Sequence, residues 1–492
     1  MSIKPYIFIL FAFIIQGSLY AADSPKREIR AVWISTIYGM DWPVKTATTP
    51  ETRKAQQQDL CNKLDMLKEA NFNMILLQVR LRGDVIYKSE IEPMSRVLTG
   101  RTGGNPGYDP LTFAIEECHK RGMECHAWFV TYPVGKADYV RMLGSKSIVK
   151  QRPDLCKFYN GEWYMDPGLP GTTDYILSLV KEVVTNYDID GVHFDYIRYP
   201  ENGDGFPDGT VYAKYGAGKS LRAWREDNIN RLVARIYDSV KRAKPWVQVS
   251  SSPLGKVSPL PNVPNAGLTG RSVFQNTQEW LRQEKQDLIV PMMYYRGNYF
   301  YPFIDKWMAN KNGRYVVPGL GIYRMLPGDA NWSLDEISQQ IEYVRSAKAD
   351  GISFFRGAQL FRNYKGLYNK LKNNYFKYPA LLPPLTWSSE EKPPTPVNVN
   401  VIREGDLLRI SWMMRDDDES LSYTVYYSRS SSVNTTLSSS IAATGLRKWD
   451  LYLSVDATIE QEFTFCVTAS NRYHIESNPS QEIYYYLSKY SK

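Results

Sequence analysis

A short apolar segment of this chain ends in a carboxylate. Residues 191–195, Gly-Val-His-Phe-Asp, have the composition of a buried β-strand, and Asp195 is the last of them. A carboxylate costs free energy at the end of an apolar strand unless it is paired or used in chemistry. In a parallel α/β barrel, the carboxyl ends of the strands carry the active site. Asp195 is therefore predicted to act as a nucleophile, a general base or a stabiliser of a cationic sugar transition state.

Other polar side chains belong to neighbouring predicted strands. Side chains two residues apart share one face of a strand, so His193 shares a face with Asp195. Arg80 is expected to reach Asp195 and to hold it ionised, with His193 helping to orient it. The alternative is that Arg80 and Asp195 form a buried pair without a chemical role. The residues expected to contact substrate at these strand ends are Arg80, Asp84, His126, Trp128 and His193.

Glycoside hydrolysis by Asp195 would need a second carboxyl group. Retaining enzymes place the two groups about 5 Å apart, and inverting enzymes place them farther apart. The predicted strands that follow residue 195 end without an acid, so this group should come from a loop. Glu201 is favoured as the second catalytic residue because it follows Asp195 closely, although any single loop glutamate can simply be solvated. The other candidates are Asp41, Asp84, Glu90, Glu92, Asp166, Asp204 and Asp208.

Aromatic residues are abundant and gather near the predicted strand ends. They make up 13% of the 492 residues, and 36 of them are tyrosines. Flat rings with a polar edge suit the stacking of sugar units, although each ring alone could serve only packing. The rings at or after strand ends are Trp33, Trp42, Trp128, Tyr294, Tyr295, Tyr299 and Tyr323. Trp33, Tyr294 and Tyr295 are predicted to bind substrate together with Trp128.

Several other kinds of site are not indicated by the sequence. No Ser-His-Asp order stands out, and the four histidines form no H-E-x-x-H motif. The five cysteines show no C-x-x-C spacing, so neither a metal nor a cofactor is expected. The net charge of +8 is spread along the chain without a basic arm, which argues against a nucleic-acid partner.

Alternating apolar and amphipathic segments predict how these side chains are positioned. Near-continuous apolar runs indicate strands of a parallel sheet that is buried on both faces. Eight such strands with intervening helices predict a (β/α)8 TIM-type barrel over residues 27–380. An open doubly wound sheet is less favoured because no glycine-rich phosphate turn follows a strand. The predicted strands are 29–35, 73–80, 124–130, 191–195, 247–251, 288–295, 315–321 and 351–355, and the clearest helices are 53–70, 109–121, 172–187, 224–243 and 333–347.

The two ends of the chain differ from the predicted barrel. Residues 1–22 carry a lysine, an apolar run and small residues before a cleavage point, the pattern of a secretory signal peptide. The apolar run is too short to span a membrane comfortably, so we expect cleavage, no transmembrane anchor, and a periplasmic or cell-envelope location.

Residues 381–394 are predicted to be a linker. Residues 395–488 show short alternating strands typical of a small all-β, immunoglobulin-like sandwich, which resembles a fibronectin type III domain around Trp412, Tyr423 and residues 469–477.

Residues 27–374 carry a set of motifs that resembles one known family. The motifs are Arg-Ala-Val-Trp at 30–33, Gln-Val-Arg at 78–80, Gly-Asp at 83–84, Tyr-Asp-Pro-Leu at 108–111, His-Ala-Trp at 126–128, Asp-Pro-Gly at 166–168, Asp-Gly-Val-His-Phe-Asp-Tyr at 190–196 and Pro-Met-Met-Tyr at 291–294. The chain is identified on these motifs as a member of glycosyl-hydrolase-like family 10. The resemblance implies a barrel glycosidase with Asp195 in its active site. At least one bacterial branch of the family acts on peptidoglycan glycan strands stripped of peptides.

The resemblance and the residues together predict an exported glycoside hydrolase of an envelope polysaccharide. Many barrel glycosidases use glutamates on the fourth and seventh strands, and this chain has neither. The alternative is a carbohydrate-binding or scaffold protein that has the fold without catalysis. A transglycosylase is a third interpretation.

Overall fold

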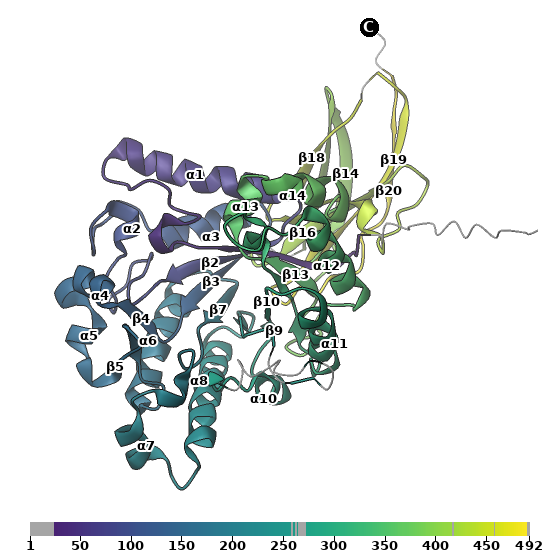
Figure 1. The fold of residues 1–492 in the computed structure, drawn as a ribbon. Helices are drawn as coiled ribbons and strands as arrows, with labels where there is room; N and C mark the ends of the chain where they lie inside the picture. Colours follow the sequence, from purple (N-terminus) through teal and green to yellow (C-terminus); the bar gives the residue numbers. More distant parts are fainter. Residues whose placement is uncertain are drawn as a thin grey trace, which may run out of the picture.

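Parallel strands surrounded by helices form the larger part of the molecule (Figure 1). The computed structural model describes residues 24–256, 259, 260, 263, 272–415, 418–456 and 458–489. The expected signal peptide, residues 1–22, lies outside the described residues, as does much of the predicted connection 252–273. Among the described helices, none combines the length and the apolar character needed to cross a bilayer.

The parallel strands close into a barrel, as predicted. The strands are β1 (Ile29–Ile34), β2 (Met74–Arg80), β3 (Glu124–Val130), β7 (Gly191–Asp195), β8 (Gln248–Ser251), β9 (Leu288–Ile289), β10 (Met292–Met293), β11 (Tyr315–Val316), β12 (Gly319–Leu320) and β13 (Gly351–Phe354). Pro291 and Pro318 divide two of the predicted strands into the halves β9 with β10 and β11 with β12, because proline cannot donate a ladder hydrogen bond. β9 pairs with β8 and β11, while β10 pairs with β12. β12 pairs with β13, which pairs with β1, so the ladder returns to its start.

Helices cover the barrel where apolar residues recur at helical spacing. Leu60, Leu64 and Leu67 of α1 are fully buried. Asp109 accepts hydrogen bonds from the first backbone N–H groups of α3, and Pro110 follows it at the first helical position. The main helices are α1 (Pro50–Glu69), α3 (Pro110–Lys120), α6 (Pro170–Asn186), α8 (Leu221–Ala243), α10 (Thr277–Arg282), α11 (Tyr301–Ala309), α12 (Leu334–Ser346), α13 (Gly357–Phe361) and α14 (Leu367–Lys370). The predicted helices are thus confirmed to within a few residues.

The long connections that follow the strands carry structure of their own. The connection after β3 forms an antiparallel sheet in the order β4–β6–β5, which the sequence analysis took for a plain loop. Its strands have only four residues each, too few for a clear period-two pattern. Figure 1 shows α2, α4 and α5 at the end of the barrel away from the C-terminal sheets. The elements of these connections are α2 (Arg96–Thr99), β4 (Pro133–Lys136), α4 (Ala137–Leu143), α5 (Ile148–Gln151), β5 (Cys156–Tyr159), β6 (Glu162–Met165) and α7 (Gly209–Tyr215).

The C-terminal part is an all-β sandwich, as predicted. Two antiparallel sheets, in the orders β14–β15–β18 and β17–β16–β19–β20, enclose an apolar core of their own. Trp412 and Tyr423 meet in this core, with ring centroids 5.4 Å apart. The likeness to a fibronectin type III domain stays a prediction. The strands are β14 (Val397–Glu404), β15 (Leu407–Met413), β16 (Ser422–Ser428), β17 (Ile441–Leu446), β18 (Asp450–Ser454), β19 (Gln461–Ser470) and β20 (Ile483–Leu487).

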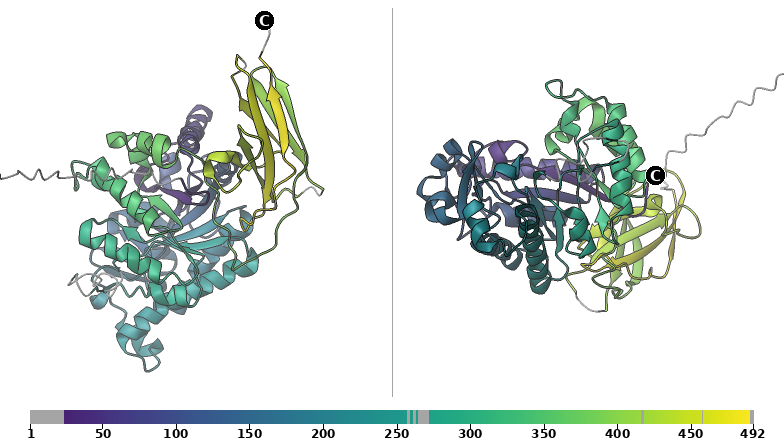
Figure 2. Two further views of the ribbon diagram at one scale, coloured as in Figure 1. Left: turned by 90° about the vertical axis from the view of Figure 1, so that its right-hand side faces the viewer. Right: turned by 60° about the horizontal axis from the view of Figure 1, so that its bottom comes forward.

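The sandwich contacts the end of the barrel at which the strands begin. Figure 2 shows its sheets outside the helical layer. His474 lies between the Glu124 carboxylate, 2.6 Å from its Nε2, and the Pro383 carbonyl oxygen, 3.0 Å from its Nδ1. Lys26 and Arg27 both pair with Glu476. These contacts fix the sandwich on the face opposite to the long loops.

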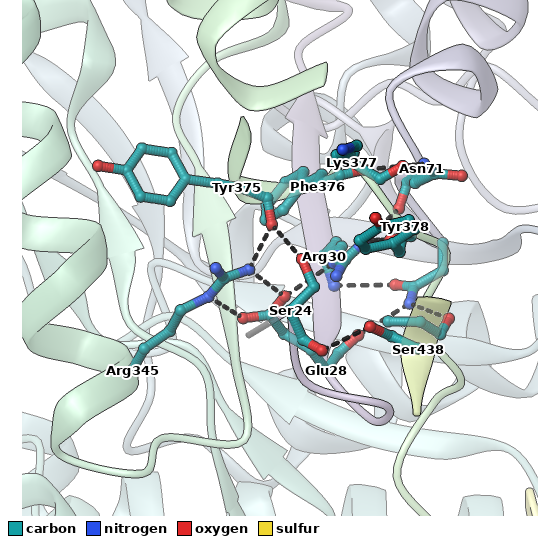
Figure 3. Close-up of polar contacts among 12 residues, drawn as sticks. Ser24, Glu28, Arg30, Asn71, Arg345, Tyr375, Phe376, Lys377, Tyr378 and Ser438 are labelled. Carbon is teal, nitrogen blue, oxygen red and sulfur yellow. Dashed lines mark hydrogen bonds and ion pairs between the residues drawn. The ribbon is translucent and has the colours of Figure 1, made fainter. Parts of the chain in front are cut away.

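A second polar cluster lies at the base of β1 (Figure 3). Glu28 accepts hydrogen bonds from both Arg30 and Arg345, at 2.7 and 2.8 Å. Arg30 also donates to the carbonyl oxygen of Tyr378 at 2.7 Å. Next to this cluster, Ser438 of the sandwich donates to the carbonyl oxygen of Ser24 at 2.6 Å. The first strand is thereby joined to α12, to the segment after α14 and to the sandwich.

The contact of His474 predicts a pH-dependent stability. Burial alone would lower the pKa of His474, but the charge and hydrogen bond of Glu124 raise it above the ordinary value of 6.5. A raised pKa stabilises the folded state fully below about pH 6.5, and the contribution is lost as the pH rises through the folded-state pKa. His474→Gln should therefore cost about 2 kcal/mol at pH 6 and clearly less at pH 9, measured by urea unfolding. An equal loss at both pH values would contradict a charged His474.

Candidate functional site

Asp195 lies at the carboxyl end of β7, at the rim of the barrel. Its side chain is 8% exposed, and its Oδ1 accepts a hydrogen bond of 2.7 Å from the backbone N–H of Tyr196. Burial raises the pKa of Asp195 above the ordinary value, while the charges of Arg198 and Arg82 and the Ser252 hydroxyl work in the opposite direction. The carboxyl group therefore lies at the strand end, as predicted, and burial and the nearby positive charges act on its pKa in opposite directions.

Two arginines lie against the ring of Tyr196, the residue that follows Asp195. The Arg198 guanidinium lies 4.6 Å from the centroid of this ring, and the Arg82 guanidinium lies 5.3 Å from it. Arg198 is only 5% exposed, yet its Nη1 has no hydrogen-bond partner within the described part of the chain. A buried donor without an acceptor costs free energy. An oxygen atom of a bound ligand could accept this hydrogen bond.

Arg80 does not contact Asp195, which corrects the prediction made from the strand pattern. Glu92, on the loop after β2, folds back and accepts hydrogen bonds from Arg80 Nε at 2.8 Å and Nη2 at 2.7 Å. Arg80 also donates to the carbonyl oxygens of Val130 and Thr131. Both members of the Arg80–Glu92 pair are buried, so Arg80 holds a loop in place and is not available to substrate.

His193 also has partners other than Asp195. The Trp33 indole N–H donates to His193 Nε2 at 3.1 Å, and His193 Nδ1 lies 2.8 Å from the hydroxyl of Ser250. Because the indole can only donate, His193 carries its proton on Nδ1 and is neutral. Burial lowers the pKa of His193 well below its ordinary value, in agreement with a neutral ring. Trp33 and His193 therefore form a rigid layer in the barrel interior and are closed to solvent.

The other predicted polar contacts lie deeper than the rim. His126 is fully buried and bonds Glu124 at 2.9 Å, near the end of the barrel that the sandwich covers. Trp128 packs in the apolar interior of the barrel, and its indole N–H has no partner among the described residues. Asp84 is fully buried, and the Tyr139 hydroxyl donates its one hydrogen to this carboxylate, lying 2.9 and 3.0 Å from its two oxygens. These three residues are buried in or beside the barrel and do not line its rim.

Aromatic rings form one wall next to Asp195. Tyr294 stacks on Phe355 with 5.5 Å between centroids, and Tyr323 packs edge-on against both. Burial raises the pKa of Tyr294, and the nearby charge of Asp195 raises it further. Tyr295, half-buried, carries the Lys256 ammonium 4.5 Å from its ring centroid. Tyr294 and Tyr295 thus lie at the predicted face, and Phe355 joins them.

Two glutamates lie on the connections that follow β3 and β7, near Arg82 and Tyr196. Glu201 is exposed, and its charge adds to the burial that raises the pKa of Tyr196 and of Tyr295. Glu162 on β6 was missed by the sequence analysis because its hairpin resembled a loop. The Tyr164 hydroxyl donates to Glu162 at 3.1 Å, and Arg82 lies 3.9 Å from it. Both glutamates are candidates for the second carboxyl group.

The remaining acids considered from the sequence have other partners. Asp41 pairs with Arg356 at 2.7 Å, and Asp208 pairs with the buried Arg225 at 2.7 Å. Asp166 accepts a hydrogen bond from the backbone N–H of Gly168, and burial raises its pKa to about 6. These three carboxylates are buried, whereas Glu90, Asp204 and Glu201 are exposed and Glu162 is half-buried.

Comparison with known proteins gives one family match and several relatives. A family model described as Glycosyl hydrolase-like 10 matches residues 28–336. The chain is 30% identical to "Glycosyl hydrolase YngK" of Bacillus subtilis over 96% of both chains. It is 34% identical to "Glycosyl hydrolase DigH" of Escherichia coli over 58% of this chain and 70% of the relative. Among solved structures, the glycoside hydrolase domain of PgaB from Bordetella bronchiseptica aligns with a TM-score of 0.48 and 14% identity, over 70% of this chain and 98% of that one.

Proposed function

Because the chain belongs to the glycosyl hydrolase-like 10 family, we propose that it is an exported glycosidase of bacterial envelope polysaccharide, with peptide-free peptidoglycan strands as its substrate. The family match and the names of the relatives support a glycosidase. The signal pattern of residues 1–22 supports export, and the family resemblance supports the choice of polymer. The observation that carries the proposal is Asp195, a largely buried carboxyl group at the rim beside an aromatic wall.

In the proposed reaction Asp195 acts on the anomeric carbon of the sugar. Its carboxylate serves as the nucleophile or stabilises the positive charge that develops as the glycosidic bond breaks. Arg198 donates its free N–H to an oxygen of the sugar, and the ring wall around Tyr294 packs against the apolar face of the pyranose. A sugar so placed would satisfy the donor that the unbound protein leaves unpaired.

Glu201 is proposed as the general acid that protonates the departing oxygen, and Glu162 is the second candidate. An acid assists departure most when the leaving group is a poor one. A variant that lacks the general acid should therefore lose activity on glycan strands, and it should still cleave aryl glycosides, which have good leaving groups. Comparing Glu201→Gln with Glu162→Gln on both substrates assigns the role. A full loss on both substrates would instead indicate a role like that of Asp195.

Removal of Arg198 should shift the pH profile. Asp195 has to be ionised to act as a nucleophile, so activity falls as the pH drops through its pKa. The charge of Arg198 lowers that pKa. Arg198→Met should therefore move the acid limb of the kcat/KM profile to higher pH, and Arg198→Lys should keep the limb closer to that of the wild-type protein. An unchanged limb in Arg198→Met would contradict electrostatic coupling to Asp195.

The function is tested by offering the protein purified substrates. Peptide-free peptidoglycan strands and a panel of neutral and acidic polysaccharides are incubated with it, and products are identified by mass spectrometry. Shortened glycan strands are expected when the wild-type protein acts on the peptidoglycan sample, and none when the Asp195→Asn variant does.

The β-strands β8, β10 and β12 end without a carboxylate, which favours a protein that binds carbohydrate without cleaving it as the second candidate. Binding without any product would support that second candidate.

A further inference from the structure

A hollow lies at the rim of the barrel, among the connections that follow β1, β2 and β3. It has a volume of about 740 Å³, within the usual range for ligand sites. Its walls come from the loop after β1, from α2 and from the start of α4. We call it the rim hollow, and the lining residues that matter here are Tyr38, Val44, Lys45, Arg96, Lys136 and Tyr139.

Contacts connect the rim hollow to Asp195. Tyr38 packs edge-on against Tyr139, and the Tyr139 hydroxyl donates to Asp84 at 2.9 Å. Asp84 in turn accepts from the backbone N–H of Arg82 at 3.1 Å, and the Arg82 guanidinium lies over Tyr196. The hollow and the surroundings of Asp195 are therefore joined by one chain of side-chain and backbone contacts.

The backbone of the β4–β6 hairpin gives a second connection. Lys136 of the hollow is the cross-strand partner of Glu162, and Glu162 lies 3.9 Å from Arg82. Directly opposed residues of antiparallel strands have neighbouring side chains when they point to the same face. The β4–β6 hairpin therefore links the hollow to Glu162 and Arg82.

Three cations of the rim hollow have no acidic partner. Lys45, Arg96 and Lys136 are exposed, and none forms an ion pair with a carboxylate of the described chain. The partner of Arg96 is the sulfur of Met142, at 2.8 Å. The acid in the lining is Asp138, whose carboxylate accepts a hydrogen bond from the backbone N–H of Tyr139. The hollow is therefore net positive and complements an anionic ligand.

Tyr38 adds an apolar surface to these charges. Its side chain is 75% exposed, and its backbone has a φ of 55°, in the left-handed region. A bulky residue in that conformation costs on the order of 1–3 kcal/mol and often marks a functional position. Val44 beside it is 65% exposed. An aromatic face next to unpaired cations suits a ring that carries a carboxylate.

We propose that the rim hollow is a distal subsite for a carboxylate-bearing sugar of the glycan whose other end lies at Asp195. The inference rests on the proposed function and deepens it, because it names the group of the glycan that the hollow recognises. Lys45, Arg96 and Lys136 recognise the carboxylate, and Tyr38 packs against the sugar ring.

The test compares charged and neutralised forms of one glycan. Peptide-free peptidoglycan strands carry a lactyl carboxylate on every second sugar, and coupling to methylamine removes that charge. Binding of both forms is measured by calorimetry in the Asp195→Asn background, which prevents turnover. We expect the charged form to bind about tenfold more tightly at low salt, with the difference falling as salt rises.

Substitutions then locate the charge recognition. The triple variant Lys45→Met, Arg96→Met and Lys136→Met should bind both forms with the affinity of the neutral form. A matched triple variant of Lys181, Lys348 and Lys448, exposed lysines outside the hollow, should keep the tenfold preference. Equal binding of the two forms, no binding of either, or a preference that survives the triple variant would overturn the subsite. A lack of products from every glycan, with the charge preference intact, would overturn only the proposed hydrolysis.

Discussion

Replacing Asp195 by asparagine should lower the turnover of glycan strands by a factor on the order of 10⁴, the scale seen when an essential charged group is removed from an active site. The amide has nearly the same shape and can still accept the hydrogen bond from the Tyr196 N–H, but it can neither carry the negative charge nor attack the sugar. The initial rate is measured with peptide-free peptidoglycan strands by the release of reducing ends.

Two controls separate loss of chemistry from loss of structure. Asp195→Asn should unfold at a temperature no lower than that of the wild-type protein, because burial raises the pKa of Asp195 and so disfavours its charged form in the folded state. Binding of the glycan should also persist. Full activity in the variant would exclude Asp195 as the catalytic carboxylate, and retained folding with lost binding would assign it to substrate binding alone.

Truncating Glu92 to alanine should destabilise the protein by about 3–5 kcal/mol, the usual cost of leaving one member of a buried ion pair without its partner. Arg80 would keep its contacts with the backbone carbonyl oxygens of Val130 and Thr131, but its charge would lose both hydrogen bonds to Glu92. Tyr175, whose hydroxyl also donates to Glu92, would lose its acceptor. The free energy of unfolding in urea measures this cost.

A second variant shows that the loss comes from the unpaired charge. Replacing both members by apolar residues, Arg80→Met with Glu92→Leu, should recover a large part of the stability, because no buried charge remains. Truncation of Glu226, which pairs with Arg222 on the surface, should change the stability far less. A double variant as unstable as Glu92→Ala would show that the packing of the loop, and not its charge, is decisive.

The sequence determined the barrel well because its signals are local. Each strand is a short apolar run, and each main helix repeats its apolar residues at helical spacing, so both could be located from the chain alone. The hairpin that carries Glu162 was missed because four-residue strands leave no reliable pattern. Its position depends on contacts with the barrel rim, such as the ladder between β4 and β6.

Side-chain partners within the site were less predictable than the fold. Alternation along a strand gives the face of a residue but not its height in the barrel, which is why His126 was expected at the rim although it lies near the base. Arg80 was paired with Asp195 on the same reasoning. Its true partner, Glu92, comes from a loop whose return path is set by tertiary packing. The position of Asp195 at the rim was predictable because this residue ends its strand.

The contact between His474 and Glu124 has a consequence for the modularity of the chain. The sandwich supplies a cation that neutralises a carboxylate of β3, so it completes the floor of the barrel. A barrel cut free at residues 381–394 would retain His126 as the remaining histidine partner of Glu124 and would open that floor to water. The barrel and the sandwich are therefore not independent units of stability. Exchanging sandwiches between homologous proteins would require positions 124 and 474 to be exchanged together.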